Sequence, residues 1–77
     1  MKITILFFGQ LEEITGASSL KLNDISDTDD LKNKLQKQFP ALEKITFSIA
    51  VNKKMMQKNT ILKPNDEVAL LPPFSGG

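Results

Sequence analysis

The chain has 77 residues, of which 40% are hydrophobic and 25% charged, and its formal net charge is +1. This length suffices for one small domain, which buries only about 60% of its unfolded surface and leaves little room for a deep active site. All of its basic residues are lysines, and it contains no histidine, cysteine, tyrosine or tryptophan. The composition therefore argues against nucleic-acid binding, disulfides, thiolate metal sites and histidine-based catalysis.

The N-terminal third predicts two short strands. Residues 2–8 alternate between two faces, as the side chains of a strand do. Residues 10–16 fit a short turn of helix closed by Gly16, and residues 19–22 fit a second strand. The segment 23–27 is polar and is expected to be a loop. We find no signal peptide core and no apolar run near the ~20 residues of a membrane span, so we expect a cytoplasmic protein without membrane contact.

A longer helix is expected next. Leu31, Leu35 and Phe39 recur at every fourth position and form the apolar face of an amphipathic helix. Thr28 is expected to cap its N-terminus, because a hydroxyl can accept a hydrogen bond from the first free amides. Pro40 is expected to end it.

The C-terminal half predicts three more strands. Residues 47–52 alternate, a lysine-rich hairpin or loop follows, and a short strand is expected at residues 60–62. The segment Lys63-Pro64-Asn65-Asp66 predicts a tight turn, in which proline pre-sets φ, asparagine tolerates positive φ and the aspartate side chain fixes the turn. The last strand is expected at residues 67–71.

One helix covering one face of a mixed sheet predicts an α+β roll. Met55 and Met56 are interpreted as core filler in preference to an adaptable contact surface. The predicted core consists of the inward-facing apolar residues of the strands and the helix, which are Ile3, Ile5, Phe7, Leu20, Leu22, Leu31, Leu35, Phe39, Phe47, Ile49, Val51, Val68 and Leu70.

The last two residues are glycines and follow a stiff apolar stretch, Leu70 to Ser75. A terminal diglycine has nothing to pack, but without Cβ atoms it is thin enough for its carboxylate to enter a narrow site on another protein. A frayed end is the alternative, although such an end is usually polar. We therefore predict a domain at residues 1–72, an extended tail at residues 73–77, and a reactive group at the Gly77 carboxylate.

Two segments resemble a known family. Residues 5–16 and 62–77, together with Ala50-Val51-Asn52, resemble the small, sulfur-carrier subunits of molybdopterin synthase, which belong to the MoaD/ThiS-type β-grasp family. The ending Asp-Glu-Val…Pro-Pro-x-Ser-Gly-Gly is the most specific part. The resemblance implies a ubiquitin-like β-grasp fold, with one main helix on one face of a mixed sheet and a protruding C-terminal tail. Glu12 and Glu13 depart from the family, which often carries arginine there.

The resemblance also implies a chemistry for Gly77. A terminal carboxylate is ionised at neutral pH and lacks a leaving group. In this family a ubiquitin-activating-like adenylyltransferase adenylates the C-terminal glycine with ATP, and a sulfur donor protein displaces AMP to leave a thiocarboxylate. The thiocarboxylate then supplies sulfur to cyclic pyranopterin monophosphate in molybdenum cofactor biosynthesis.

In such an assembly the tail would enter the large, catalytic synthase subunit, in a heterotetramer of two small and two large subunits. The inserted residues would be Pro73, Phe74, Ser75, Gly76 and Gly77. The chain is thus expected to be inactive alone and to bind no cofactor or metal. The catalytic side chains would belong to the large subunit.

A docking surface follows if the first and last strands are neighbours. Leu6, Phe8, Ala69 and Leu71 would then share the sheet face away from the helix, with Phe74 as an anchor beside them. Phe74 could instead fold back on the domain's rim. Three other functions stay open at this point: a thiamine-type sulfur carrier, a ubiquitin-like modifier joined through Gly77 to target lysines, and an interaction module with an inert tail.

Overall fold

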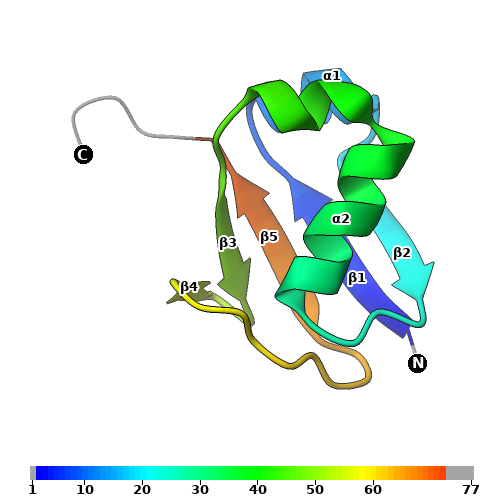
Figure 1. Cartoon of the computed structure of the whole chain (residues 1–77), viewed down its shortest axis with the longest axis vertical. Coiled ribbons are helices and arrows are strands. Elements are labelled where there is room, and N and C mark those ends of the chain that lie inside the picture. The colour runs from blue at the N-terminus through cyan, green and yellow to red at the C-terminus, as the bar shows by residue number, and fades with distance from the viewer. Residues whose placement is uncertain (1, 73–77) are drawn as a thin grey trace.

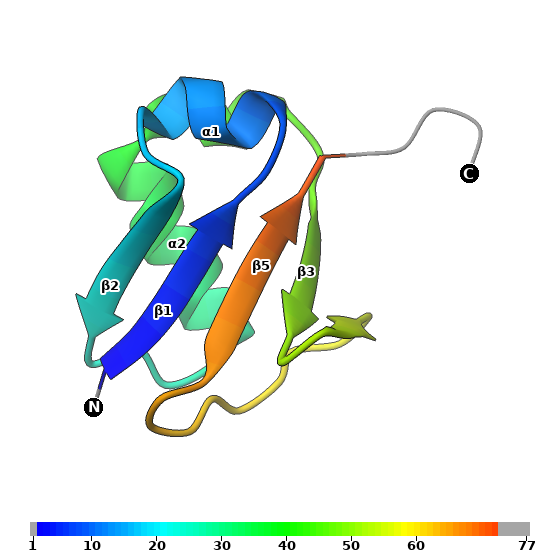
Figure 2. The ribbon, with the colours of Figure 1, turned by 180° about the vertical axis from the view of Figure 1, so that it is seen from behind.

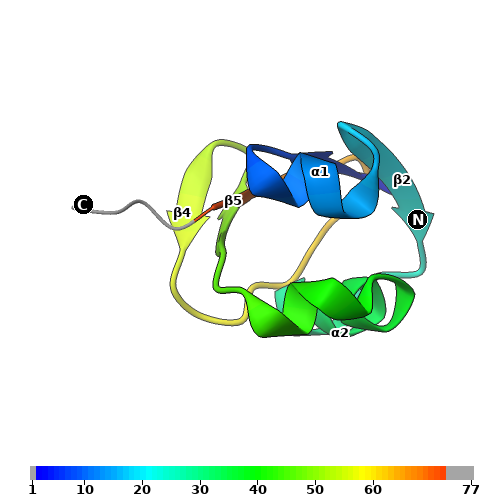
Figure 3. The same cartoon turned by 90° about the horizontal axis from the view of Figure 1, so that it is seen from above.

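The computed structural model describes residues 2–72 of the chain (Figure 1). Its elements in chain order are β1 (Lys2–Phe7), α1 (Gln10–Thr15), β2 (Ser19–Asn23), α2 (Thr28–Gln38), the 3-10 helix η1 (Pro40–Lys44), β3 (Ser48–Val51), β4 (Lys54–Met56) and β5 (Glu67–Leu71). Helix α2 lies across one face of the sheet, so the described residues form two layers (Figure 3). The predicted α+β class, with one main helix on one sheet face, is confirmed.

The five strands form one mixed sheet in the order β2-β1-β5-β3-β4. Strands β1 and β5 pair in parallel, and the other neighbours pair antiparallel. The last strand therefore lies in the middle of the sheet, between the first strand and β3 (Figure 2). This order is that of the predicted β-grasp fold.

The core lies between the sheet and α2. Ile3, Ile5 and Phe7 of β1 are buried, because alternation directs all three toward the helix. Leu31 and Leu35 of α2 meet them from the other layer. The other predicted core residues that are only partly buried still pack against this cluster, and these are Leu20, Leu22, Phe39, Phe47 and Ile49.

Apart from Leu11 of α1, three residues of the buried cluster are absent from the predicted core. Ile25, Leu42 and Leu62 are each at most 3% exposed, although none lies in a strand or in α2. Ile25 belongs to the segment predicted as a polar loop; residues 24–27 do form a loop between β2 and α2, but Ile25 is buried in the core. Connecting segments carry no periodicity, so the sequence offers no regular signal for which of their residues turn inward.

The start of α2 differs from the prediction. Asp27, not Thr28, is the N-cap, and its Oδ1 accepts a hydrogen bond from the Asp30 amide at 2.8 Å. Thr28 is buried instead: its Oγ1 donates to Asn59 Oδ1 at 3.2 Å and accepts from the Thr60 amide at 2.9 Å. The hydroxyl is therefore used to tie the segment before β5 to the helix.

The prediction of a short strand at residues 60–62 is also wrong. This segment forms a single bridge, Asp27 to Ile61, and the strand lies earlier, at Lys54–Met56. The Thr60 amide is already committed to Thr28, and the Leu62 amide donates to the Ser26 carbonyl. These hydrogen bonds hold the segment against the start of α2, away from the sheet.

The turn into β5 is fixed by side chains, as predicted. Asn65 has a φ of 69°, and Asp66 Oδ2 accepts from the Lys63 amide at 2.8 Å. Asn52 links this turn to the β3–β4 hairpin, because its Nδ2 donates to Asp66 Oδ1 at 2.9 Å and its Oδ1 accepts from the Glu67 amide at 3.0 Å. Two hydrogen bonds hold the pKa of Asp66 below its ordinary value of 3.8. The larger effect comes from the main-chain amide of Lys63 and the smaller from the side-chain amide of Asn52.

We expect Ile25→Ala to lower the free energy of unfolding by about 2–5 kcal/mol, since it removes a buried side chain and leaves a cavity. That is a large part of the roughly 4–12 kcal/mol expected for a domain of this size. Ile61→Ala is the matched control, because Ile61 is 77% exposed and its truncation should change stability by no more than about 0.5 kcal/mol. Urea denaturation of both variants checks this, and equal losses would contradict the assigned core.

We expect Asp66→Asn to destabilise the domain at neutral pH by about 0.5–1.5 kcal/mol, because the amide group cannot replace both carboxylate contacts. The folded-state pKa of Asp66 is depressed, so its contribution to stability is complete above the ordinary value of 3.8 and is lost as pH falls through the folded value. The stability gap between wild type and variant should therefore shrink below pH ~4. A gap that is constant from pH 7 to pH 2 would exclude a charged role.

Candidate functional site

The predicted reactive tail lies outside the described residues. Gly77, the tail residues Pro73, Phe74, Ser75 and Gly76, and the anchor role of Phe74 all stay predictions. The structure describes the base of this tail, which is β5 and Pro72. The site can therefore be built from the sheet up to residue 72.

Strand β5 ends at the same end of the sheet as the one where α1 lies (Figure 2). Its last residue, Leu71, pairs with Ser48 of β3. On the other side the Phe8 amide donates to the Leu70 carbonyl at 3.3 Å, which extends the contact with β1 by one residue. Pro72 follows and is partly buried. The base of the tail is thus held between β1 and β3.

The predicted docking residues do come together. Leu6 is paired with Ala69 across the β1–β5 ladder, and both side chains lie on the face opposite α2. Leu71 lies on the same face two residues further along β5, next to the end of β1, where Phe8 is 44% exposed. Leu6, Ala69 and Leu71 are partly buried. We call these four residues the outer-face patch.

The outer-face patch continues across two more strands than predicted. Ala69 is paired with Ala50 of β3, and Ala50 with Met55 of β4, so an apolar row crosses the sheet from Leu6 to Met55. Met55 is 51% exposed, and its assignment to the core is wrong. Met56 does pack against the core. Alternation is the reason, because neighbouring residues of a strand point to opposite faces, and this signal was available in the sequence.

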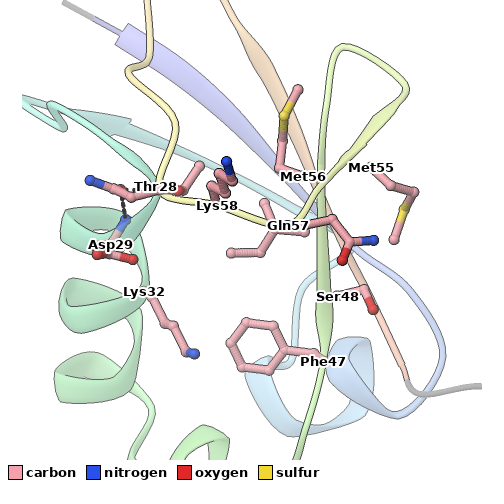
Figure 4. A pocket seen from close by; sticks show the side chains of 11 residues that line it. Thr28, Asp29, Lys32, Phe47, Ser48, Met55, Met56, Gln57 and Lys58 are labelled. Carbon is pink, nitrogen blue, oxygen red and sulfur yellow. Dashed lines mark hydrogen bonds between the residues drawn. The ribbon is translucent and has the colours of Figure 1, made fainter.

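A pocket of about 290 Å³ lies between α2 and the β3–β4 hairpin (Figure 4). Phe47, Ile49 and Met56 supply its apolar wall, and the Lys32 ammonium lies 5.8 Å from the centroid of the Phe47 ring. On its polar side, Asn59 Oδ1 already accepts from the Asp29 amide at 2.9 Å and from the Thr28 hydroxyl. These hydrogen bonds stabilise the start of α2, so the polar groups have a structural role.

Among the described residues, Asp29, Lys32 and Lys58 are the titratable groups that line the pocket, and the outer-face patch contains none. Asp30 and Asp66 have lowered pKa values, Asp30 chiefly because its carboxylate accepts from the Ser26 amide, and both serve turns or caps. Within residues 2–72, no group of three or more carboxylates is arranged to hold a metal ion. The described part of the chain therefore offers a binding surface and a tail base.

The described helices include none that is long and apolar enough to cross a membrane. The longest, α2, has 11 residues and an amphipathic pattern with only one buried side.

Several known proteins resemble this chain in sequence over its whole length. The sulfur carrier subunit of molybdopterin synthase from Haemophilus influenzae is 34% identical, with 97% of this chain and 99% of that protein covered. The protein of the same description from Chlamydomonas reinhardtii is 35% identical, and both chains are covered completely.

Solved structures share the fold. A molybdopterin converting factor subunit 1 from Pyrococcus furiosus superposes with a TM-score of 0.86 at 20% identity, covering 96% of this chain and 99% of that one. The complex of subunits 1 and 2 of the molybdopterin-converting factor from Helicobacter pylori gives a TM-score of 0.77 at 28% identity, with both chains fully covered. The small archaeal modifier protein 1 of Methanosarcina acetivorans gives 0.84 at 26% identity, covering 99% and 96%.

The sequence also matches the ThiS family as a whole, in agreement with the relatives above. The match begins within β1 and extends over residues 5–77, which includes the outer-face patch, the base of the tail and the diglycine. This chain belongs to the ThiS family.

Proposed function

We propose that this chain is the sulfur-carrier subunit of a molybdopterin synthase and that it carries sulfur as a thiocarboxylate on Gly77. The observation that carries the proposal is the full-length similarity to curated proteins of that description, at 34–35% identity. The structure adds support, because β5 leads the chain out of the sheet beside the outer-face patch, where Phe8 is 44% exposed and the other three residues are partly buried, so a partner can cover it.

The chemistry takes place at the main-chain carboxylate. The chain has no cysteine to hold a persulfide and no histidine to act as a base. In the proposed route a carboxylate oxygen of Gly77 attacks the α-phosphate of ATP on a ubiquitin-activating-like adenylyltransferase, and pyrophosphate leaves. Sulfur released by a donor protein as hydrosulfide then attacks the activated carbonyl carbon, AMP leaves with the former carboxylate oxygen, and loss of the sulfur-bound proton gives the thiocarboxylate. ATP is thus a co-substrate of the partner, and its use fits a cytoplasmic location.

The proposed acceptor site lies in the large subunit of the synthase, where the thiocarboxylate donates sulfur to cyclic pyranopterin monophosphate. Residues 73–77 can span at most about 17 Å, at 3.3–3.6 Å per residue, which is enough to cross the wall of a partner's pocket. Leu6, Phe8, Ala69 and Leu71, extended by Met55, would cover the partner's surface beside that pocket. The Helicobacter pylori relative, described as a complex of subunits 1 and 2, supports such an assembly.

A ubiquitin-like modifier is the second candidate function. The structural likeness to the modifier protein of Methanosarcina acetivorans, at 26% identity, favours it. Both functions begin with activation of the Gly77 carboxylate, so the fold does not separate them. High-resolution intact mass of the chain from its host does: replacement of one oxygen by sulfur identifies a carrier, whereas conjugates to larger proteins identify a modifier.

We expect deletion of Gly76 and Gly77 to abolish sulfur transfer, because it removes the reactive carboxylate, and to leave the fold intact, because glycine has no side chain to bury. Synthase reconstituted with purified partners, ATP and a sulfur donor measures transfer, and circular dichroism measures folding. Addition of one residue after Gly77 should also abolish transfer, since it displaces the reactive carbonyl. Full activity of either variant would remove the terminal carboxylate from the mechanism.

We expect Phe8→Ala to weaken binding to the large subunit by about 1–3 kcal/mol, the range of an aromatic interface anchor. Ile61→Ala is the control, since Ile61 is also exposed but bridges to Asp27 at the start of α2, away from the outer face. Calorimetric titration of both variants, and of Phe74→Ala, measures the affinities. An unchanged affinity of Phe8→Ala would remove this residue from the interface.

A further inference from the structure

Gly9 makes an unusually close approach to the base of the tail. It lies between β1 and α1 with a φ of 58° and a ψ of −134°, a conformation that favours glycine. A Cβ added to Gly9 would lie 2.9 Å from Cγ of Pro72, closer than two carbon atoms can pack. Gly16 also has a positive φ, 75°, yet nothing lies within 4 Å of an added Cβ. At Gly16 the positive φ is the only reason for a glycine, whereas at Gly9 the contact with Pro72 is a second reason.

This contact lies where sheet hydrogen bonding ends. The β3–β5 ladder reaches Leu71, which pairs with Ser48. Pro72 has no amide hydrogen and cannot extend it. Its ring lies against the surface of Gly9, where there is no side chain.

Gly9 is itself held firmly. Its carbonyl accepts from the Glu12 amide at 3.1 Å in the first turn of α1, and the amide of the preceding Phe8 donates to the Leu70 carbonyl at 3.3 Å. The turn that carries Gly9 is thus joined to both β1 and β5. We call the contact between Gly9 and the ring of Pro72 the proline seat.

We propose that Gly9 is a positioning residue for sulfur transfer: through the proline seat it sets the direction in which the chain leaves the sheet toward residues 73–77. The proposal rests on the proposed function, since only an inserted tail needs a defined exit direction. The φ of Pro72 is fixed by its ring, and the proline seat also restricts where the ring lies. Both restrictions are in place before the tail inserts, which lowers the conformational entropy lost on binding.

The test uses full-length chains that carry a C-terminal thiocarboxylate, prepared by sulfide cleavage of intein fusions so that adenylation is bypassed. Gly9→Leu places a side chain where the Pro72 ring lies. We expect its affinity for the large subunit to stay within about threefold, because the outer-face patch is unchanged, and its transfer rate at saturating large subunit to fall about 10- to 100-fold, as expected when a reacting group is misplaced by about 1 Å.

Two controls separate positioning from folding. Gly16→Leu adds the same side chain at another positive φ, in open space, and should keep the wild-type transfer rate. Pro72→Gly removes the ring, so the double variant Gly9→Leu/Pro72→Gly should transfer sulfur no more slowly than Pro72→Gly alone. If Gly9→Leu is unfolded by urea titration, Gly9→Ala, whose Cβ also reaches the ring, takes its place in the same cycle.

The outcomes are distinct. A Gly9 variant that transfers sulfur as fast as wild type, or whose effect multiplies with that of Pro72→Gly, would overturn the proline seat as a positioning device. A wild-type thiocarboxylate that gives no product with the large subunit and cyclic pyranopterin monophosphate would instead overturn the proposed function.

Discussion

The parallel pairing of β1 with β5 is the interaction on which the rest of the structure depends. It places the last strand in the centre of the sheet, where both of its neighbours hydrogen-bond to it. Val68 and Leu70 are thereby buried under α2, and Ala69 and Leu71 are aligned with the outer residues of β1 and β3. The chain that follows β5 consequently starts from the most constrained part of the domain.

The two faces of this sheet have different tasks. The face under α2 holds the buried cluster, and burial of this apolar area is the main stabilising term of so small a domain. The other face carries an apolar row from Leu6 to Met55, in which Met55 is 51% exposed, Leu6 and Ala69 are partly buried and Ala50 is buried. The accessible part of this row is suited to a partner surface. The proposed function uses it in this way, with the reactive carboxylate supplied by the main chain.

The base of the tail shows how a small sheet domain can contribute geometry to a reaction. Asn52 and Asp66 fix the entry into β5, and the β1–α1 turn meets its exit at Pro72. Both ends of the strand are thus defined by contacts outside the ladder. A partner that receives the tail would then bind a segment whose starting point and direction are already determined.

Local patterns in the sequence determined much of this protein. Alternation in β1 and β5, the spacing of Leu31 and Leu35, and the turn residues before β5 each predicted an observed element, because strand, helix and turn conformations depend on neighbours in the chain. The diglycine and the segments around it indicated the family, which the comparisons confirmed. The outer-face position of Leu6 and Ala69 also followed, once the end strands were taken as neighbours.

Only the tertiary structure decided the features that depend on distant segments. Thr28 lost the capping role to Asp27 because Asn59 and Thr60 bind its hydroxyl from 31 and 32 residues away. Ile25 and Leu62 became core residues because two loops cross the same end of α2, where the Leu62 amide donates to the Ser26 carbonyl. The contact between Gly9 and Pro72 likewise joins residues that are 63 positions apart in the sequence. Such contacts follow from how the elements pack together, and a one-dimensional pattern records only the preferences within each element.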